Sequence, residues 1–264
     1  KAGETPVDLA LGAEKLYRPL RENGGKPGNL NAILKGASKL PYDEEGETAL
    51  ENEMVILIRE LASANYDFNA KLSYFSYRFW RGEDSNDFDK DGVSDEDEEL
   101  VKSDEFDPDD TPTPEEVSIA KEELAKRDPM SFLKYRRLPM EPLMFAVHQN
   151  PHLEKVITLL LELGANANVQ EEITGITPLH LAVYSRYTEP KEMIAKALIA
   201  KGANVNALDI NNQTPLDYFE SPLDYGDEFF ESYDANEDSI ADLLKLLKKH
   251  GAKTGDELLD AANP

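Results

Sequence analysis

Residues 176–182 read I-T-P-L-H-L-A, and residues 213–218 repeat the pattern as Q-T-P-L-D-Y. Another copy, E-T-P-V-D-L-A, lies at residues 4–10, and E-P-L-M-F-A at residues 141–146 is a weaker one. A threonine before a proline favours the start of a helix, because the hydroxyl can cap the helix and the missing proline N–H costs nothing in the first turn. Each of these stretches therefore predicts the beginning of a helix.

The starts at residues 141–146, 176–182 and 213–218 are each followed by an apolar helical stretch that ends at Gly-Ala. These stretches are L-L-L-E-L-G-A-N-A-N at residues 159–168, A-L-I-A-K-G-A-N-V-N at 197–206 and L-K-L-L-K-K-H-G-A at 244–252. Glycine suits the left-handed backbone that ends a helix, and the small side chain of Ala182 lets two helices approach. One such helical pair cannot bury its apolar face alone, so the pattern predicts that several units stack.

At T-P-L-H-L-A and K-G-A-N-V-N-A the chain resembles the ankyrin-repeat family, most clearly over residues 142–258. The resemblance implies an all-α solenoid of helical hairpins, with about five repeats of which some are degenerate. It also implies that protein partners bind the concave surface of turns and first helices. The alternative is a set of unrelated helical hairpins.

Degenerate repeats are expected towards the N-terminus. Residues 17–25 fit the end of a repeat, and the expected helices are 31–40 and 72–80 as first helices, with 54–70 and 115–128 as their second helices. Gly164 and Gly202 are 38 residues apart, and Gly202 and Gly251 are 49 apart, against the family's 33. We expect the extra residues to lie between the two helices of each repeat.

The composition restricts the partners. The chain has 264 residues and a net charge of −25, from 53 acidic and 28 basic residues. This balance disfavours nucleic acid and anionic lipid, which need Lys and Arg clusters, and favours a basic protein or a metal cation. No run of about 18 apolar residues predicts a membrane span, and the absence of cysteine leaves no disulfide framework.

The acidic residues gather in two blocks. Residues 83–116 contain 17 acidic residues and two lysines, and residues 217–238 contain nine acidic residues and no Lys or Arg. We therefore divide the chain into three parts: degenerate ankyrin-like repeats at 1–80, an acidic calcium-binding insertion at 81–114, and ankyrin repeats at 115–264 with an acidic-aromatic insertion at about 220–237.

Residues 87–98, D-F-D-K-D-G-V-S-D-E-D-E, have the spacing of an EF-hand loop. Such a loop needs oxygen ligands at positions 1, 3, 5, 7, 9 and 12 and a glycine at position 6. The predicted calcium ligands are the carboxylates of Asp87, Asp89, Asp91, Asp95 (through water) and Glu98, with the carbonyl oxygen of Val93.

Residues 87–113 as a whole resemble the calcium repeats of secreted bacterial proteins and thrombospondin type 3 repeats, because D-P and D-T-P follow the loop. Ser94 departs from paired EF-hands, which carry Ile or Val there, and no second loop exists. We predict one calcium site, with a solvated acidic linker as the alternative. Because calcium is abundant outside cells, we also expect a periplasmic or extracellular location.

No catalytic motif is present, and the histidines do not supply one. His148 and His152 have the i, i+4 spacing of a zinc pair, but Pro151 between them breaks a helix. The resemblance implies that His180 is structural and hydrogen-bonds the neighbouring turn. We therefore expect no enzymatic activity.

The acidic-aromatic insertion is the candidate contact with a partner. Tyr225, Phe229, Phe230 and Tyr233 are potential interface anchors, and the acid around them would steer a basic partner. The alternative is that these rings pack on the edge of the stack. The sequence thus predicts a non-enzymatic protein-binding scaffold with a structural calcium site. Other readings are an inhibitor or immunity protein against a secreted toxin, a structural envelope protein, and an enzyme accessory with a site within residues 31–80.

Overall fold

A computed structural model describes residues 30, 33–34, 44–71, 100–101, 111–135, 140–149, 153–184, 188–220 and 237–262. Over these ranges the chain forms helices and connecting turns, with no strand, so the all-α prediction is confirmed there. The helices are α4 (Glu44–Ser63), α6 (Pro114–Arg127), α7 (Pro129–Tyr135), α8 (Pro142–Gln149), α9 (Glu154–Glu162), α10 (Pro178–Tyr184), α11 (Thr188–Ala200), α12 (Pro215–Glu220), α13 (Glu237–Lys249) and α14 (Gly255–Ala262).

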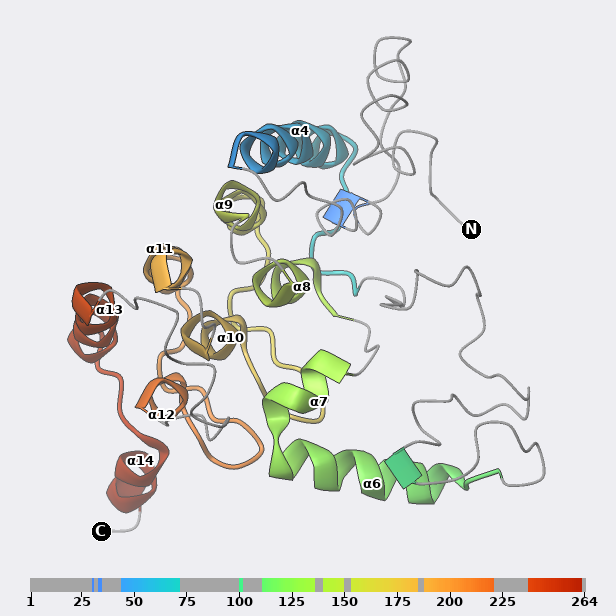
Figure 1. Ribbon diagram of the computed structural model, residues 1–264, viewed down its shortest axis with the longest axis vertical. Helices are drawn as coiled ribbons and strands as arrows, with labels where there is room; N and C mark the ends of the chain where they lie inside the picture. Colours follow the sequence, from blue (N-terminus) through green and yellow to red (C-terminus); the bar gives the residue numbers. More distant parts are fainter. Residues whose placement is uncertain are drawn as a thin grey trace.

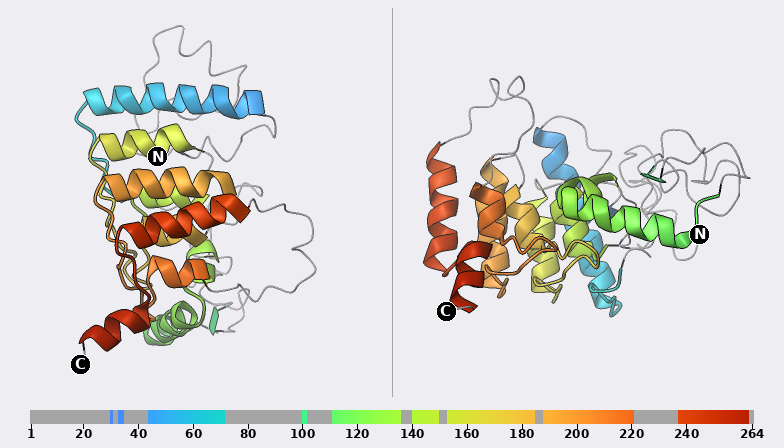
Figure 2. Two further views of the ribbon diagram at one scale, coloured as in Figure 1. Left: turned by 90° about the vertical axis from the view of Figure 1, so that its left-hand side faces the viewer. Right: turned by 90° about the horizontal axis from the view of Figure 1, so that it is seen from below.

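Seven of these helices form two parallel rows. The first helices α8, α10 and α12 make the inner row, and the second helices α4, α9, α11 and α13 make the outer row (Figures 1 and 2). Neighbours pack along each row, and α8 with α9, α10 with α11, and α12 with α13 pack as hairpins. Paired short helices in this arrangement are consistent with ankyrin repeats.

The expectation that the extra residues lie between the helices of a pair holds for the last repeat alone: three residues separate α10 from α11, against four between α8 and α9, and α11 has 13 residues where α9 has nine. Helix α10 ends at Tyr184 and α11 begins at Thr188, whereas α12 ends at Glu220 and α13 begins at Glu237. The residues added between α12 and α13 leave both rows in contact, which is why the stack tolerates the added length.

Residues 44–71 supply the second helix and the closing turn of an earlier repeat. The helix expected at 54–70 begins at Glu44 and ends at Ser63 instead. Asn65 takes φ 58°, the left-handed conformation that Gly164, Gly202 and Gly251 take at the ends of later second helices. Asparagine adopts this conformation more readily than other non-glycine residues, so the helix ends where glycine would have ended it.

Helix α4 also completes the start of its neighbour α9. Leu153, at the N-cap of α9, makes no side-chain capping bond. The carboxylate of Glu51, a buried residue of α4, accepts a hydrogen bond from the backbone N–H of Lys155 at 2.6 Å. A donor left over at a helix start is thus satisfied by the preceding repeat, which joins residues 44–71 to the stack.

The helix expected at residues 115–128 is present as α6, but it is not the second helix of a repeat. Helix α6 packs against α7, and both lie on the inner-row side, away from the outer row (Figure 1). The buried residues of α6 are Val117 and Ala125, whereas α9 buries five large apolar residues. A helix with so little apolar surface cannot fill a place in the outer row.

The long insertion comprises the residues between Lys71 and α8, and helix α7 brings its end into the core. Met130 and Leu133 are 5% and 1% exposed and belong to the main hydrophobic cluster, and Phe132 is fully buried. Residues 178–183 of α10 are all buried as well. The insertion therefore returns to the stack at α7 before α8 begins the next repeat. In the described residues no helix is both long and apolar enough to cross a membrane.

Candidate functional site

The turn after each second helix is tied to the turn of the next repeat by one asparagine. The side-chain N–H of Asn168 donates to the carbonyl of Gly202 at 2.8 Å, and its Oδ1 accepts from the N–H of Asn204 at 2.7 Å. One repeat earlier, Asn69 donates to the carbonyl of Gly164 at 3.2 Å and accepts from the N–H of Asn166 at 2.8 Å.

Asn206 makes the third such link, to the carbonyl of Gly251 at 3.0 Å and the N–H of Lys253 at 2.8 Å. The three links set Asn69, Asn168 and Asn206 in equivalent positions of successive repeats. Each one satisfies a donor and an acceptor of the exposed backbone. The turns therefore form one continuous row. We call the outer parts of these turns, residues 69–71, 169–177 and 207–214, the tips.

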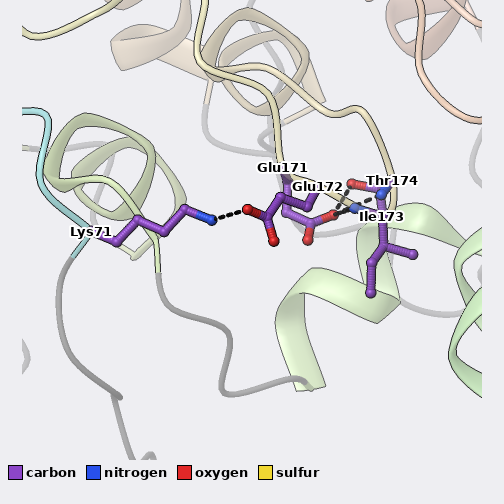
Figure 3. Close-up of polar contacts among 5 residues, drawn as sticks. All are labelled: Lys71, Glu171, Glu172, Ile173 and Thr174. Carbon is purple, nitrogen blue, oxygen red and sulfur yellow. Dashed lines mark hydrogen bonds and ion pairs between the residues drawn. The ribbon is translucent and has the colours of Figure 1, made fainter. Parts of the chain in front are cut away.

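The middle tip is braced by a carboxylate (Figure 3). Oε2 of Glu171 accepts hydrogen bonds from the N–H groups of Ile173 at 3.1 Å and Thr174 at 2.7 Å, and from the Thr174 hydroxyl at 2.7 Å. This carboxylate is used to hold its own loop. The neighbouring Glu172 side chain is left at the surface, 77% exposed.

Glu172 and Lys71 join two tips that lie 101 residues apart in the sequence. Nζ of Lys71 is 2.7 Å from Oε1 of Glu172 (Figure 3). The bond to Glu172 raises the pKa of Lys71, with smaller contributions from the charges of Glu172, Glu141 and Glu171. Both side chains are exposed, so the pair contributes little stability, and its charged groups are open to a partner.

The third tip is held from beneath by Asp209. Its Oδ1 accepts from the N–H groups of Asn211 at 2.8 Å and Gln213 at 2.7 Å, and its Oδ2 accepts from the hydroxyl of Tyr218 at 2.6 Å. Burial, followed by this hydrogen bond, raises the pKa of Tyr218 above its ordinary value. Tyr218 therefore stays a neutral donor, and the N–H of Ile210 ties this tip to the carbonyl of Thr174 at 2.7 Å.

His180 connects α10 to the third tip. Its Nδ1 accepts from the N–H of Thr177 at 3.1 Å, so the ring proton lies on Nε2, which donates to the carbonyl of Gln213 at 3.2 Å. Burial lowers the pKa of His180 to about 4, although the Gln213 carbonyl and nearby carboxylates act in the opposite direction. The predicted hydrogen bond to the neighbouring turn is confirmed.

Asp217 fills the same sequence position one repeat later. Its Oδ2 accepts from the N–H of Thr214 at 2.7 Å, from the Thr214 hydroxyl at 2.8 Å and from the N–H of Gly255 at 2.8 Å. His180 donates to the following repeat, whereas Asp217 accepts from it. A histidine can donate to the carbonyl that the next turn presents to it, and an aspartate can accept from the N–H that the next turn presents to it.

Helix α6 adjoins the third tip. The side-chain N–H of Asn211 donates to the carbonyl of Lys126 at 2.8 Å, beside the single residue, Asp128, that separates α6 from α7. The tips and α6 thus belong to one side of the molecule, opposite the outer row (Figures 1 and 2). We take this side as the candidate functional site.

The ionisable groups of this site serve mainly to fix the backbone of the tips through hydrogen bonds. Glu171, Asp209 and Asp217 each accept from backbone N–H groups, and the described residues contain no group of three or more His, Asp or Glu that could hold a metal ion. Such an arrangement offers a rigid surface with exposed side chains.

The residues singled out from the sequence lie elsewhere. The predicted calcium ligands, Asp87, Asp89, Asp91, Val93, Asp95 and Glu98, and the predicted partner contacts, Tyr225, Phe229, Phe230 and Tyr233, fall outside the described residues. Conversely, sequence reasoning missed the asparagine links. The repeated N-A-N and N-V-N at 166–168 and 204–206, matched by D-F-N at 67–69, were the signal that could have revealed them.

The comparisons with known proteins agree with this geometry. Residues 143–219 match a family model described as ankyrin repeats in three copies. The match covers α8 to α12, with two of the three tips.

Among curated proteins, the ARF GTPase-activating protein GIT1 is similar to a segment of this chain. The human, mouse and rat proteins are each 41% identical to it over 59 residues, which is 22% of this chain. The matched segment spans 7% of the length of these relatives. The similarity is therefore confined to a short segment of either protein.

Proposed function

We propose that this chain is a non-enzymatic scaffold that binds a protein partner on the side formed by the tips and α6. The observation that carries the proposal is the continuous row of tips, fixed by Asn69, Asn168 and Asn206. A surface that is rigid before binding loses little conformational entropy when a partner docks. Ankyrin repeats imply protein partners, and the matched repeats include two of these tips.

We propose that the partner is basic. The chain carries a net charge of −25, and the carboxylate of Glu172, which is paired with Lys71, lies exposed on the middle tip. Acidic fields of this kind raise the rate at which a cationic partner arrives.

We further propose a single calcium site at residues 87–98 and an exported location. The spacing of the acidic residues supports the first, and the abundance of calcium outside cells supports the second. The site would lie upstream of α6, whose N-cap is Thr113, so bound calcium would restrain the chain that leads into the helix.

Capture from the native source tests the function. The immobilised chain is incubated in millimolar calcium and, separately, in chelator, and captured proteins are quantified for the parent, Glu172→Lys and Glu162→Lys. Both glutamates are exposed, but Glu162 lies on the outer row and serves as the matched control.

We expect Glu172→Lys to weaken capture of a basic protein and Glu162→Lys to leave it nearly unchanged. Equal capture by all three chains would exclude the tips as the contact surface. A fourth chain, with Phe229, Phe230 and Tyr233 changed together to Ser, asks whether the acidic-aromatic insertion contributes. Reduced capture with an unchanged melting temperature would assign it a binding role.

A further inference from the structure

Helix α6 is held firmly although it buries little. At its start, the side chain of Glu116 accepts from the N–H of Thr113 at 2.9 Å while the Thr113 hydroxyl accepts from the N–H of Glu116 at 3.3 Å. Near its end, Asn211 binds the carbonyl of Lys126. Because both ends are fixed, the helix is formed before any partner arrives.

The outward face of α6 carries one large apolar side chain. Ile119 is 52% exposed, and it is one of four large hydrophobic residues that the described part of the chain leaves exposed. The nearest neighbours of this residue on the helix surface all carry a negative charge.

Four glutamates surround Ile119. The residues three and four positions before and after it, which are its nearest neighbours on a helix surface, are Glu115, Glu116, Glu122 and Glu123, and all four are exposed. Lys126, one turn further along, lies 3.7 Å from Glu122 and offsets part of this charge. The face is therefore an apolar centre within an acidic frame.

Ile56 on α4 offers a comparison within the same chain. It is 46% exposed, but the residues at the same four spacings are Asn52, Glu53, Arg59 and Glu60, so its frame has mixed charge. It also lies on the outer row, opposite α6 (Figure 1). An exposed isoleucine alone is therefore not the distinguishing feature of α6.

We propose that α6 is a recognition helix, whose Ile119 face docks into an apolar groove rimmed by Lys and Arg on a partner protein. Helices are commonly recognised in this way, with apolar residues as anchors in a groove. The acidic frame fits a basic rim and disfavours an acidic one. This inference rests on the proposed protein-binding function and adds the element that is recognised and the chemistry of the partner.

The test uses a defined probe on the full chain. The probe is a small designed helical bundle with a leucine-lined groove between two of its helices and lysines along both rims of the groove. It is titrated into chain with labelled isoleucine methyl groups in physiological salt and millimolar calcium. We expect the Ile119 methyl signal to shift in step with binding, and the Ile56 signal to stay in place.

Two matched pairs of variants make the result specific. Ile119→Ser should weaken probe binding by about tenfold or more, the usual scale for removing a buried aliphatic anchor, and Ile56→Ser should not. Glu122→Gln with Glu123→Gln should weaken binding and reduce its salt dependence, whereas Glu53→Gln with Glu60→Gln should have little effect. Because the changed residues are polar or exposed, melting curves should confirm that each variant remains folded.

An unmoved Ile119 signal at saturating probe would overturn the inference, as would equal effects of Ile119→Ser and Ile56→Ser. Probe binding that survives Ile119→Ser would show a general attraction to the acidic chain instead of recognition of α6. That outcome leaves the scaffold function standing, because the capture experiment with Glu172→Lys does not depend on α6.

Discussion

His180 and Asp217 show how one position of the repeat can be used in two ways. Each caps the start of its own helix through a threonine and contacts the following turn, His180 as a donor to Gln213 and Asp217 as an acceptor from Gly255. The role of His180 was predicted from the resemblance of T-P-L-H-L-A to ankyrin repeats. That of Asp217 was not predicted, because an aspartate replaces the histidine of this pattern there.

The buried His180 makes stability depend on pH. Its pKa is about 4 in the folded chain against 6.5 for an unperturbed histidine, so below pH 6.5 the unfolded chain binds a proton that the folded chain does not. Stability should therefore fall as the pH drops from 6.5 to 4, by about 3 kcal/mol from this residue, and this contribution should level off below pH 4.

Urea unfolding at several pH values checks this effect. His180→Asn should be less stable at pH 7 but should show a shallower decline between pH 6.5 and 4. A parallel decline in parent and variant would mean that His180 is not the group that titrates.

Gly255 is required by close backbone packing. A Cβ built at this position would lie 1.8 Å from the carbonyl oxygen of Asn212. Gly255→Ala should therefore displace α14 and destabilise its packing by about 1–3 kcal/mol. Hydrogen exchange should show the amides of residues 256–262 losing protection, while α9 to α11 keep theirs. Asp256→Ala, at an exposed neighbouring position, is the control and should leave α14 protected.

At the scale of elements, the ends of the outer helices decide where repeats begin and stop. Glycine at 164, 202 and 251 allowed these ends to be predicted, because the helix-stop pattern is local. The end of α4 was misplaced because Asn65 replaces glycine there. The position of α6 could not be predicted, since its contact with Asn211 joins segments 85 residues apart.

Substitutions at Asn65 test its role in ending α4. Asn65 is exposed with φ 58°, so Asn65→Gly should leave the free energy of unfolding unchanged or raise it slightly. Asn65→Val should lower it by about 1–2 kcal/mol, because a β-branched residue is strained in this conformation. Urea denaturation of the two variants measures the difference. Equal stabilities would mean that the turn does not hold its left-handed conformation in solution.

At the scale of the whole molecule, the stack accepts its insertions at two kinds of place. The shorter one lies between α12 and α13, and the long one leaves at the tip after Lys71 and returns at α7 before α8. Repeat matching could locate residues 142–258 because the motifs recur there. It could not show that α7 packs into the core, because M-S-F-L-K-Y resembles no repeat.

Calcium should stabilise the chain moderately without being needed for the fold. A site with a dissociation constant of about 0.1–1 mM contributes about 1–2 kcal/mol at a few millimolar free calcium. Glu98→Gln should remove most of this gain, because it alters the predicted bidentate ligand, and Glu96→Gln should not. Calorimetry and melting curves in calcium and chelator decide the matter. Identical curves with no heat of binding would leave residues 87–98 as an acidic linker.

The proposed function requires that a partner meets the side of the stack formed by the tips and α6. The direct measurement is hydrogen exchange of the full chain, alone and with the basic protein that it captures in calcium. We expect added protection at the tips, residues 69–71, 169–177 and 207–214, and along α6, with α4, α9, α11 and α13 unchanged. Protection confined to those four outer helices, with none at the tips or α6, would contradict the proposed function.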